Sequence, residues 1–313
     1  MKAVVVEASQ EVALADVPEP AAGPGQAVVD VEAIGVGYVD VMALRGQYAP
    51  FPGAGSVLGL EAVGRVRTAG PGVPEHLVGK RVLALPDFGA YAERVAVGTG
   101  QLLPAPDGAD PVDVVALGLN ALVAEGALSR TGVSSGERVL IRGASGGIGV
   151  LATQIAHALG AEVTVVTSSA ERGERLRKLG ATEVVDRTQS ALPEDAYDVI
   201  VDTVAGPQVH EHLELLRPNG RYVLCGGAAG APGTETFDAL LRTFHNSPTL
   251  LAFSLNSLTP EDRRRSWDRV VGLLADGKLS AVVDRSFPLT DAATALQRVD
   301  RGQSFGKVVL RQG

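Results

Sequence analysis

Hydrophobic and polar positions alternate over short stretches in the first part of the chain, which is the pattern of half-buried strands. The stretches are rich in valine, and turn signals such as Gly23-Pro24-Gly25 and Gly70-Pro71-Gly72 separate them. Closely spaced short strands with Gly/Pro turns predict a small barrel or sandwich. The predicted strands cover residues 3–8, 12–17, 27–36, 62–68, 81–85 and 91–97.

From about residue 110 the hydrophobic period lengthens, and strands alternate with helices. Residues 110–128 predict a helix, and a later helix carries Ile148, Leu151 and Ile155 on one apolar stripe. Strands joined by such crossovers predict a parallel, doubly wound sheet. Six strands are expected at 138–142, 162–167, 183–186, 198–204, 221–226 and 249–255, with further helices at 170–179 and 207–216.

Two helices are well signalled in the last segment. Thr259 is a suitable N-cap followed by Pro260, and Gly277 fits the C′ position of the same helix. Thr290 is expected to cap a second helix that ends near Arg301. Strands at 281–287 and 307–311 are expected to return to the first domain, which would make the fold discontinuous.

Composition narrows the class of protein. A length of 313 residues suggests two domains, and the single cysteine excludes both a disulfide framework and a zinc site built on two or more cysteines. The net charge of −8 argues against nucleic-acid binding. The apolar run at the N-terminus is too short for a signal peptide, and no run of 18 apolar residues suggests a membrane span. We expect a cytoplasmic protein with neither nucleic-acid nor membrane partners.

The strongest local signal is a glycine-rich turn between the strand at 138–142 and the helix after it. Gly143, Gly146 and Gly149 form a Gly-x-x-Gly-x-x-Gly pattern, which also includes Ser145, Gly147 and Ile148. Such a turn lets the backbone approach a pyrophosphate and presents helix N–H groups to its charge, which favours a dinucleotide site. The alternative is that the glycines only permit close packing of strand on helix.

The same residues also fit a second class of enzyme. Gly143-Ala144-Ser145-Gly146-Gly147 reads as Gly-x-Ser-x-Gly, the nucleophile elbow of α/β-hydrolases. Asp202 and then a histidine (His210, His212 or His245) follow in the required order. An α/β-hydrolase has several strands of its sheet before the elbow, whereas a glycine-rich, barrel-like region precedes it here, which argues against this architecture.

The end of the second parallel strand indicates which dinucleotide is preferred. NAD sites usually have an acidic residue there, but this strand ends in Thr167-Ser168-Ser169. Hydroxyl groups followed by Arg172, with Arg187 after the third strand, suit the 2′-phosphate of NADPH. Alternatively, one of the serines caps the following helix and Arg172 is solvated.

The whole chain resembles the zinc-independent quinone oxidoreductase branch of the medium-chain dehydrogenase/reductase superfamily. The order and spacing of several short motifs carry this resemblance. They are Gly37-Tyr38-Val39-Asp40, Arg45-Gly46-Gln47-Tyr48, Gly59-Leu60-Glu61-Ala62-Val63-Gly64, Gly89-Ala90-Tyr91-Ala92-Glu93, Gly143–Gly149, Leu216-Arg217-Pro218-Asn219-Gly220-Arg221 and Gly306-Lys307-Val308-Val309-Leu310.

The resemblance implies an α/β protein with two domains. A GroES-like β-barrel catalytic domain would comprise residues 1–119 and 255–313, and a Rossmann domain with a doubly wound parallel sheet would comprise residues 120–254. It also implies NADPH as the cofactor and commonly a homodimer. With the turn and strand-end residues above, the cofactor-binding set becomes Ser145, Gly146, Gly147, Ile148, Thr167, Ser168, Ser169, Arg172, Arg187, Val204, Gly226, Phe253, Ser254, Leu255 and Lys307.

No metal site is expected. Zinc-dependent relatives carry Gly-His-Glu where this chain has Gly59-Leu60-Glu61, and leucine cannot bind a metal. The cysteine, Cys225, ends a predicted strand and reads as a small buried residue. The five histidines show no metal-ligand spacing.

Without a metal, hydrogen-bond donors must polarise the substrate. The resemblance places Tyr38 and Tyr48 beside the nicotinamide, where they would be donors or wall residues, and gives Asp40 a role in ordering its loop. Asn120 stands where threonine is usual, and Gly37 where asparagine is frequent, which leaves substrate specificity open. We expect hydride transfer to a quinone or an α,β-unsaturated carbonyl; a non-catalytic NADPH-binding protein is the alternative.

Overall fold

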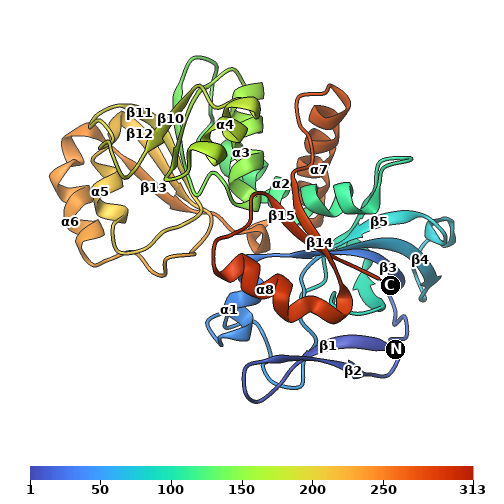
Figure 1. Cartoon of the computed structure of the whole chain (residues 1–313). Coiled ribbons are helices and arrows are strands. Elements are labelled where there is room, and N and C mark those ends of the chain that lie inside the picture. Colours follow the sequence, from blue (N-terminus) through green and yellow to red (C-terminus); the bar gives the residue numbers. More distant parts are fainter. Residues whose placement is uncertain (313) are drawn as a thin grey trace. The chain divides into compact units, whose positions relative to one another are not determined.

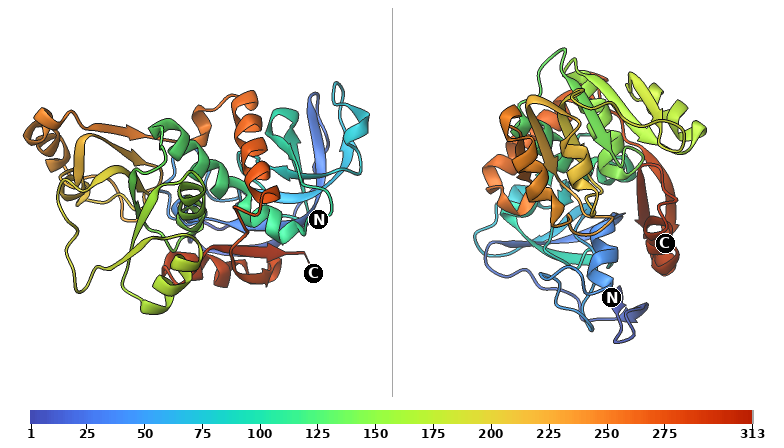
Figure 2. Two further views of the ribbon diagram at one scale, coloured as in Figure 1. Left: turned by 90° about the horizontal axis from the view of Figure 1, so that it is seen from above. Right: turned by 90° about the vertical axis from the view of Figure 1, so that its left-hand side faces the viewer.

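The structure is a computed structural model that describes residues 1–312. The chain forms two compact units (Figures 1 and 2). Unit 1 consists of Met1–Leu119 and the C-terminal segment from Ala281, and unit 2 is Asn120–Ser280. The second boundary therefore differs from the expected one at 254/255. Helix α7 (Pro260–Ala275) belongs to unit 2, where Trp267 is fully buried and Ser266 donates a hydrogen bond to Glu125.

Unit 1 is built on a sheet with the strand order β14-β15-β3-β4-β5-β7, and β6 also pairs with β3. The C-terminal strands thus return to the N-terminal half of the chain, as expected, and β15 pairs antiparallel with β3. Strands β1 and β2 form a separate antiparallel pair. The bounds are β1 Lys2–Val6, β2 Val12–Asp16, β3 Gln26–Val36, β4 Ala62–Ala69, β5 Arg81–Ala84, β6 Arg94–Gly98, β7 Leu102–Pro104, β14 Val283–Pro288 and β15 Lys307–Arg311.

Strand β3 is central to unit 1 because it is long enough to pair with several other strands. Its first half pairs with β6 and its second half with β15, while β4 runs along its other edge. The valines, alanines and isoleucine of β3 are almost all buried, so this strand lies in the middle of the core of the unit. Two short helices, α1 (Tyr38–Leu44) and α8 (Ala292–Asp300), pack together beside it. Helix α1 was not predicted: valines at positions 39 and 41 are poor helix formers.

Unit 2 is a parallel sheet with the strand order β10-β9-β8-β11-β12-β13. This is the 3-2-1-4-5-6 order of a doubly wound nucleotide-binding fold, which confirms the predicted architecture. Helices α3 and α4 cover one face, and α5 and α6 the other (Figure 1). The bounds are β8 Arg138–Arg142, β9 Glu162–Thr167, β10 Glu183–Asp186, β11 Tyr197–Asp202, β12 Leu216–Leu224, β13 Thr249–Ala252, α3 Gly147–Ala158, α4 Ala170–Lys178, α5 Val209–Leu213 and α6 Glu235–Arg242.

Helix α2 (Pro111–Thr131) contains a kink at Gly118, where φ is 25° and ψ is −131°. By length and composition alone α2 is apolar enough to cross a membrane, but 83% of that stretch is buried inside the protein, as in the core helix of a soluble fold. Helix α6 was not predicted, and α5 is shorter than its predicted 207–216. Short 3₁₀ turns are η1 Glu75–Leu77, η2 Thr99–Gln101, η3 Phe244–Asn246, η4 Leu255–Ser257 and η5 Leu289–Asp291.

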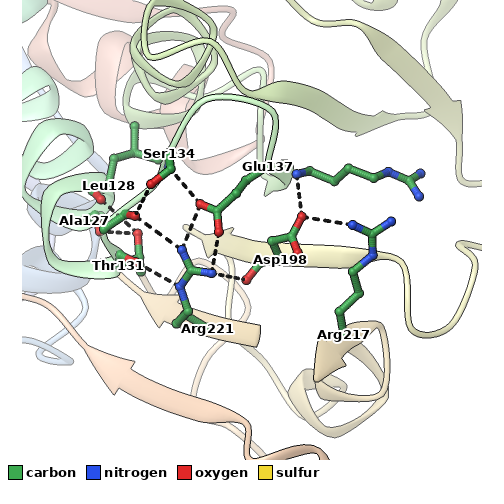
Figure 3. A network of polar contacts seen from close by, with 10 residues as sticks. Ala127, Leu128, Thr131, Ser134, Glu137, Asp198, Arg217 and Arg221 are labelled. Carbon is green, nitrogen blue, oxygen red and sulfur yellow. Dashed lines mark hydrogen bonds and ion pairs between the residues drawn. The ribbon is translucent and has the colours of Figure 1, made fainter. Parts of the chain in front are cut away.

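The amino-terminal ends of β8, β11 and β12 are tied together by charged side chains (Figure 3). The Arg221 guanidinium binds both oxygens of Glu137 at 2.8 and 2.9 Å and donates to the carbonyl oxygen of Thr131 at 2.9 Å. Asp198 accepts from the Arg138 N–H (2.8 Å) and from Arg217 (3.2 Å). This network occupies the amino end of the parallel sheet. The predicted site residues of this unit follow the opposite, carboxyl ends of the strands.

Candidate functional site

The glycine-rich turn lies between β8 and α3, as predicted, and its glycines have different structural reasons. Gly143 has a φ of +73°, and a Cβ there would overlap Thr203. A Cβ on Gly149 would overlap the backbone of Gly143 and Ala144. Gly143 is therefore required by its left-handed backbone and by the close approach of the turn after β11, and Gly149 by the close approach of α3 to the glycine-rich turn.

Gly146 is not required by close packing in the same way, because the nearest atom to a Cβ at this position would lie 3.4 Å away. It is the N-cap of α3, and no side chain caps the helix. The first N–H groups of a helix have no partner within the helix. The turn therefore combines available N–H donors with the positive end of a helix dipole, which is the chemistry that binds a phosphate group.

Asn120 lies against this turn within unit 2. A Cβ on Gly147 would overlap its Nδ2 atom, and Asn120 itself is 7% exposed. The structure thus brings together one predicted catalytic residue and part of the predicted cofactor site.

The predicted residues at the ends of β9 and β10 also meet. The Arg187 guanidinium lies 3.5 Å from the Ser168 hydroxyl, and the Arg187 N–H donates to the carbonyl oxygen of Thr167 at 3.1 Å. Ser169 is the N-cap of α4 and accepts from the N–H of Arg172 at 3.3 Å. The capping interpretation is therefore correct for Ser169, while Ser168 and Arg187 form a small cationic and hydroxylic edge.

The turn after β11 depends on a buried residue that the predicted cofactor set omits. Asp202 is fully buried, and its Oδ1 accepts the N–H groups of Val204 and Ala205 at 2.8 and 3.0 Å. Its Oδ2 accepts from Arg142 and from the Tyr222 hydroxyl, both at 2.6 Å. Ala205 has a left-handed φ of 56°, which this bonding supports. In the sequence, the signal for this role of Asp202 was a single acidic residue at the end of an apolar strand.

The remaining strand ends supply Gly226 and the segment after β13. A Cβ on Gly226 would overlap the Thr203 carbonyl, so this glycine lets β12 approach the β11 turn. Phe253 is buried, and the Arg130 guanidinium lies 5.1 Å from the centre of its ring. The Ser254 hydroxyl accepts from the N–H of Asn256, which begins the turn containing Leu255. These residues and the turns above follow the carboxyl ends of parallel strands, where ligands bind in such sheets.

The predicted tyrosines lie in unit 1. Tyr38 is the first residue of α1 and is partly buried against the core of the unit. Tyr48 is also partly buried, and its ring packs edge-on against Phe88 with a centroid distance of 6.0 Å. Phe51 makes a closer edge contact with Phe88 at 4.8 Å. The segment after α1 is therefore held by aromatic packing.

A buried polar cluster lies beside α1. Asp40 is 1% exposed; its Oδ2 accepts from the N–H of Gly37 (2.8 Å) and from the Tyr91 hydroxyl (3.1 Å). Burial raises the pKa of Asp40 to about 6. The Lys307 ammonium, predicted to contact the cofactor, is buried in an ion pair with Glu61. Sequence reasoning had no signal for this pair, because the two residues are far apart in the chain.

No three His, Cys, Asp or Glu side chains of residues 1–312 are grouped so that they could hold a metal ion. Cys225 lies at the end of β12, and burial raises the pKa of its thiol to about 12.

The geometry also decides against the hydrolase alternative. Asp202 binds Arg142, Tyr222 and backbone N–H groups rather than a histidine. His210 and His212 have their Nδ1 atoms 2.9 and 2.8 Å from backbone carbonyl oxygens of their own segment. Ser145, the third member of the supposed triad, therefore has no relay of histidine and aspartate behind it.

Comparisons with known proteins agree with this fold. Residues 23–107 match the family described as alcohol dehydrogenase GroES-like domain, and residues 179–310 the one described as zinc-binding dehydrogenase. Quinone oxidoreductase of Pseudomonas aeruginosa is 30% identical over 92% of this chain and 91% of its own length. Mycocerosic acid synthase-like polyketide synthase of Mycolicibacterium smegmatis is 32% identical over 92% of this chain, which spans only 14% of that protein.

A solved structure extends the likeness to the whole fold. The quinone oxidoreductase from Thermus thermophilus, described with its NADPH complex, is 32% identical with a TM-score of 0.82. The match covers 99% of this chain and 100% of that chain. On these grounds the chain belongs to the zinc-independent, quinone oxidoreductase-like branch of the medium-chain dehydrogenase/reductase superfamily.

Proposed function

We propose that the protein is an NADPH-dependent reductase of quinones or α,β-unsaturated carbonyl compounds. The observation that carries the proposal is the uncapped start of α3 at Gly146 and Gly147, with Asn120 packed against it. The Thermus thermophilus relative has an NADPH complex, which supports the same cofactor here.

The residues of unit 2 fit a dinucleotide on physical grounds. Gly146 leaves room at the helix start, and no atom lies within 4 Å of the Cβ position of Gly227 at the end of β12. A pyrophosphate would receive the N–H groups at the start of α3. We assign the binding of the nicotinamide side to Asn120, Val204 and the segment Phe253–Leu255.

The preference for NADPH over NADH rests on the ends of β9 and β10. The Ser168 hydroxyl and the Arg187 guanidinium are 3.5 Å apart, and the tip of β9 lacks the carboxylate that would bind a ribose diol. A 2′-phosphate would accept hydrogen bonds from both groups, and bonds between charged groups are the strong ones.

In the proposed mechanism, NADPH would supply, when bound, a hydride for the electron-poor carbon of the substrate. A side chain or water would supply the proton that completes the reduction. Tyr38 and Tyr48 donate hydrogen bonds to the substrate oxygen, on which negative charge develops. Asn120 orients the carboxamide or the substrate through its own donor group. The edge-on packing of the Tyr48 ring on Phe88 would hold one donor in place.

The two substrate classes are separated by a panel assay. The wild-type protein is incubated with NADPH and a series of quinones, alkenals and bulky enones, and cofactor absorbance and product are followed. Formation of a saturated carbonyl compound would favour enones as the substrate class. Formation of a quinol would favour quinones. Binding of NADPH without its oxidation by any acceptor would instead favour a non-catalytic NADPH-binding protein, for which the lack of polar side chains at Gly37 and Leu60 is the supporting feature.

Cofactor choice is tested by Arg187→Ala. Loss of a hydrogen bond to a charged group costs about 1.5–3 kcal/mol, so we expect KM for NADPH to rise roughly ten- to hundredfold and KM for NADH to stay unchanged. Arg177→Ala is the matched control, because this arginine pairs with Glu174 on the exposed face of α4. Equal effects of Arg187→Ala on both cofactors would contradict the assignment.

We also propose that the protein is a homodimer formed through unit 2. Strand β13 is the last of its sheet in the described residues, so its outer edge is free to pair. Phe237, Leu241 and Phe244 nearby are 77%, 74% and 75% exposed, and such apolar stripes suit a self-complementary interface. Light scattering should give twice the chain mass for the wild type and a smaller mass for Phe237→Glu with Leu241→Glu. A wild-type monomer would refute this. A cytoplasmic location stays a prediction, testable by cell fractionation.

A further inference from the structure

Helix α1 begins beside a buried group of polar side chains that the proposed mechanism does not use. Four residues form this buried cluster: Asp40, Glu61, Tyr91 and Lys307, each 3% exposed or less. They come from α1, from the segment before β4, from the segment before β6, and from β15. Charged groups are rarely buried in this way unless they are paired.

The backbone of unit 1 is shaped to admit the buried cluster. A Cβ on Gly35 of β3 would overlap the Glu61 carboxylate and the Lys307 side chain. A Cβ on Gly59, whose φ is +99°, would overlap the Tyr91 ring. The cluster therefore occupies space that two glycines keep open, rather than space left over by packing.

The charges of the buried cluster do not balance. The Lys307 ammonium is bound by Glu61 Oε1, while Glu61 Oε2 accepts from the N–H of Leu119 at 2.8 Å. Asp40 is a second carboxyl group near the same ammonium, and its Oδ1 is buried without a hydrogen-bond partner among the described residues. Two carboxylates and one ammonium leave one negative charge, which one proton on Asp40 would neutralise.

Asp40 is also the residue that fixes the start of α1. Its Oδ2 receives the Gly37 N–H and the Tyr91 hydroxyl, so residue 40 is tied back to residue 37 and to the segment before β6. Tyr38 lies within this closed turn. Both bonds are stronger when the carboxyl group is ionised, because hydrogen bonds to charged acceptors are roughly twice as strong as neutral ones.

Ionisation strengthens the two bonds, but the loss of water by the buried charge outweighs this gain. We propose that the buried cluster exchanges a single proton at Asp40, and that loss of this proton loosens the turn that carries Tyr38, so that protonated Asp40 is a positioning residue for substrate reduction. The inference rests on the proposed function, in which Tyr38 contacts the substrate. Lys307 favours ionisation of Asp40, while Glu61 and the burial itself oppose it. Burial is the largest of these effects, so the pKa of Asp40 is raised to about 6, within the range where an enzyme can respond to pH.

The first experiment needs no activity. Hydrogen exchange of the peptide covering residues 37–44 is followed from pH 5 to pH 8 and corrected for the intrinsic exchange rate. We expect the protection of the wild type to fall several-fold as the pH rises through 6 and that of Asp40→Asn to stay flat, since asparagine keeps the acceptor but cannot ionise. Tyr91→Phe removes only one of the two donors and should keep the fall. Protection of the wild type that does not change with pH would overturn the proposal.

The second experiment measures turnover with NADPH and the best acceptor of the panel. Asp40→Asn should raise kcat at pH 7 by about three- to tenfold and remove the fall in kcat around pH 6. Asp40→Ala, which loses both bonds, should lower kcat at every pH. KM for NADPH should change less than twofold in both, because unit 2 binds the cofactor. An Asp40→Asn protein with the wild-type pH profile would overturn the proposal. A wild type that shows pH-dependent protection but no turnover would refute the proposed function alone.

Discussion

Replacement of Asp40 by asparagine should make the protein more stable at neutral pH, and the size of the effect follows from burial. The pKa of Asp40 rises from its ordinary value of 3.8 to about 6, chiefly because the carboxylate loses its water on folding. At 1.36 kcal/mol for each pKa unit, ionisation of Asp40 costs the folded state about 3 kcal/mol. An asparagine avoids this cost but leaves a buried amide N–H₂ with no acceptor, a loss of about 1–3 kcal/mol that does not depend on pH.

The sign of the pH dependence follows from proton binding. Between pH 3.8 and about 6 the folded protein keeps a proton on Asp40 that the unfolded chain has released. The stability of the wild type therefore falls as the pH rises through this window, and Asp40 has no further effect above it. About 2 kcal/mol of the loss lies between pH 4.5 and pH 7.

Urea unfolding of unit 1 at several pH values checks this prediction. Hydrogen exchange of β3 and β4 peptides reports this unit separately, which matters because a protein of two units need not unfold in one step. The stability difference between Asp40→Asn and the wild type should grow by about 2 kcal/mol from pH 4.5 to pH 7. Tyr91→Phe, which keeps the carboxyl group, should retain the wild-type slope. A difference that is constant with pH would refute the argument that the buried carboxylate costs stability.

Three further outcomes are expected. Gly272→Ala should raise the stability of unit 2 by about 1 kcal/mol in thermal unfolding, because this glycine lies inside α7 with no atom within 4 Å of its Cβ position. Arg221→Ala should lower it by about 2 kcal/mol in urea unfolding, a value between those of exposed and buried ion pairs. That loss should shrink as the pH falls below 4.5. Arg221 lowers the pKa of Glu137, so protonation of Glu137 removes the stability that the ion pair contributes. Cys225 should resist alkylation at pH 8 in the native protein and react fully after unfolding, because burial raises its pKa to about 12.

The parallel sheet was predictable because its signals are local. Each strand of unit 2 contains at least a short apolar segment, and the strand, glycine turn and apolar helix around Gly143–Gly149 are contiguous in the chain. The capping residues of α7, Thr259 and Pro260, are also contiguous, and the helix begins at the predicted residue. Helices α1 and α6 were missed because short helices are stabilised by packing more than by propensity. Helix α6 also has only eight residues, too few for its apolar positions to show a helical period in the sequence.

Some residues of the candidate site were predicted and others were not, again according to whether their sequence signals are local. Residues at the ends of parallel strands, such as Ser168 and Arg187, were found because sheet topology alone brings consecutive strand ends together. The support of the turn by Asp202 was not foreseen, because its partners Arg142 and Tyr222 come from other strands. The second domain boundary was placed at 254/255 rather than after Ser280 because a sequence shows that α7 is a helix, but not on which core it packs.

The sequence by itself determined the fold class, the position of the glycine turn and the departure from zinc-dependent relatives at Leu60, because these depend on residue type and short-range periodicity. The tertiary structure decided that Asn120 lies against Gly147 and that Asp40 and Lys307 share a buried cluster with Glu61. Burial and distance between remote segments set those charges and contacts. The four cluster residues come from separate segments of the chain, and only folding removes them from water together.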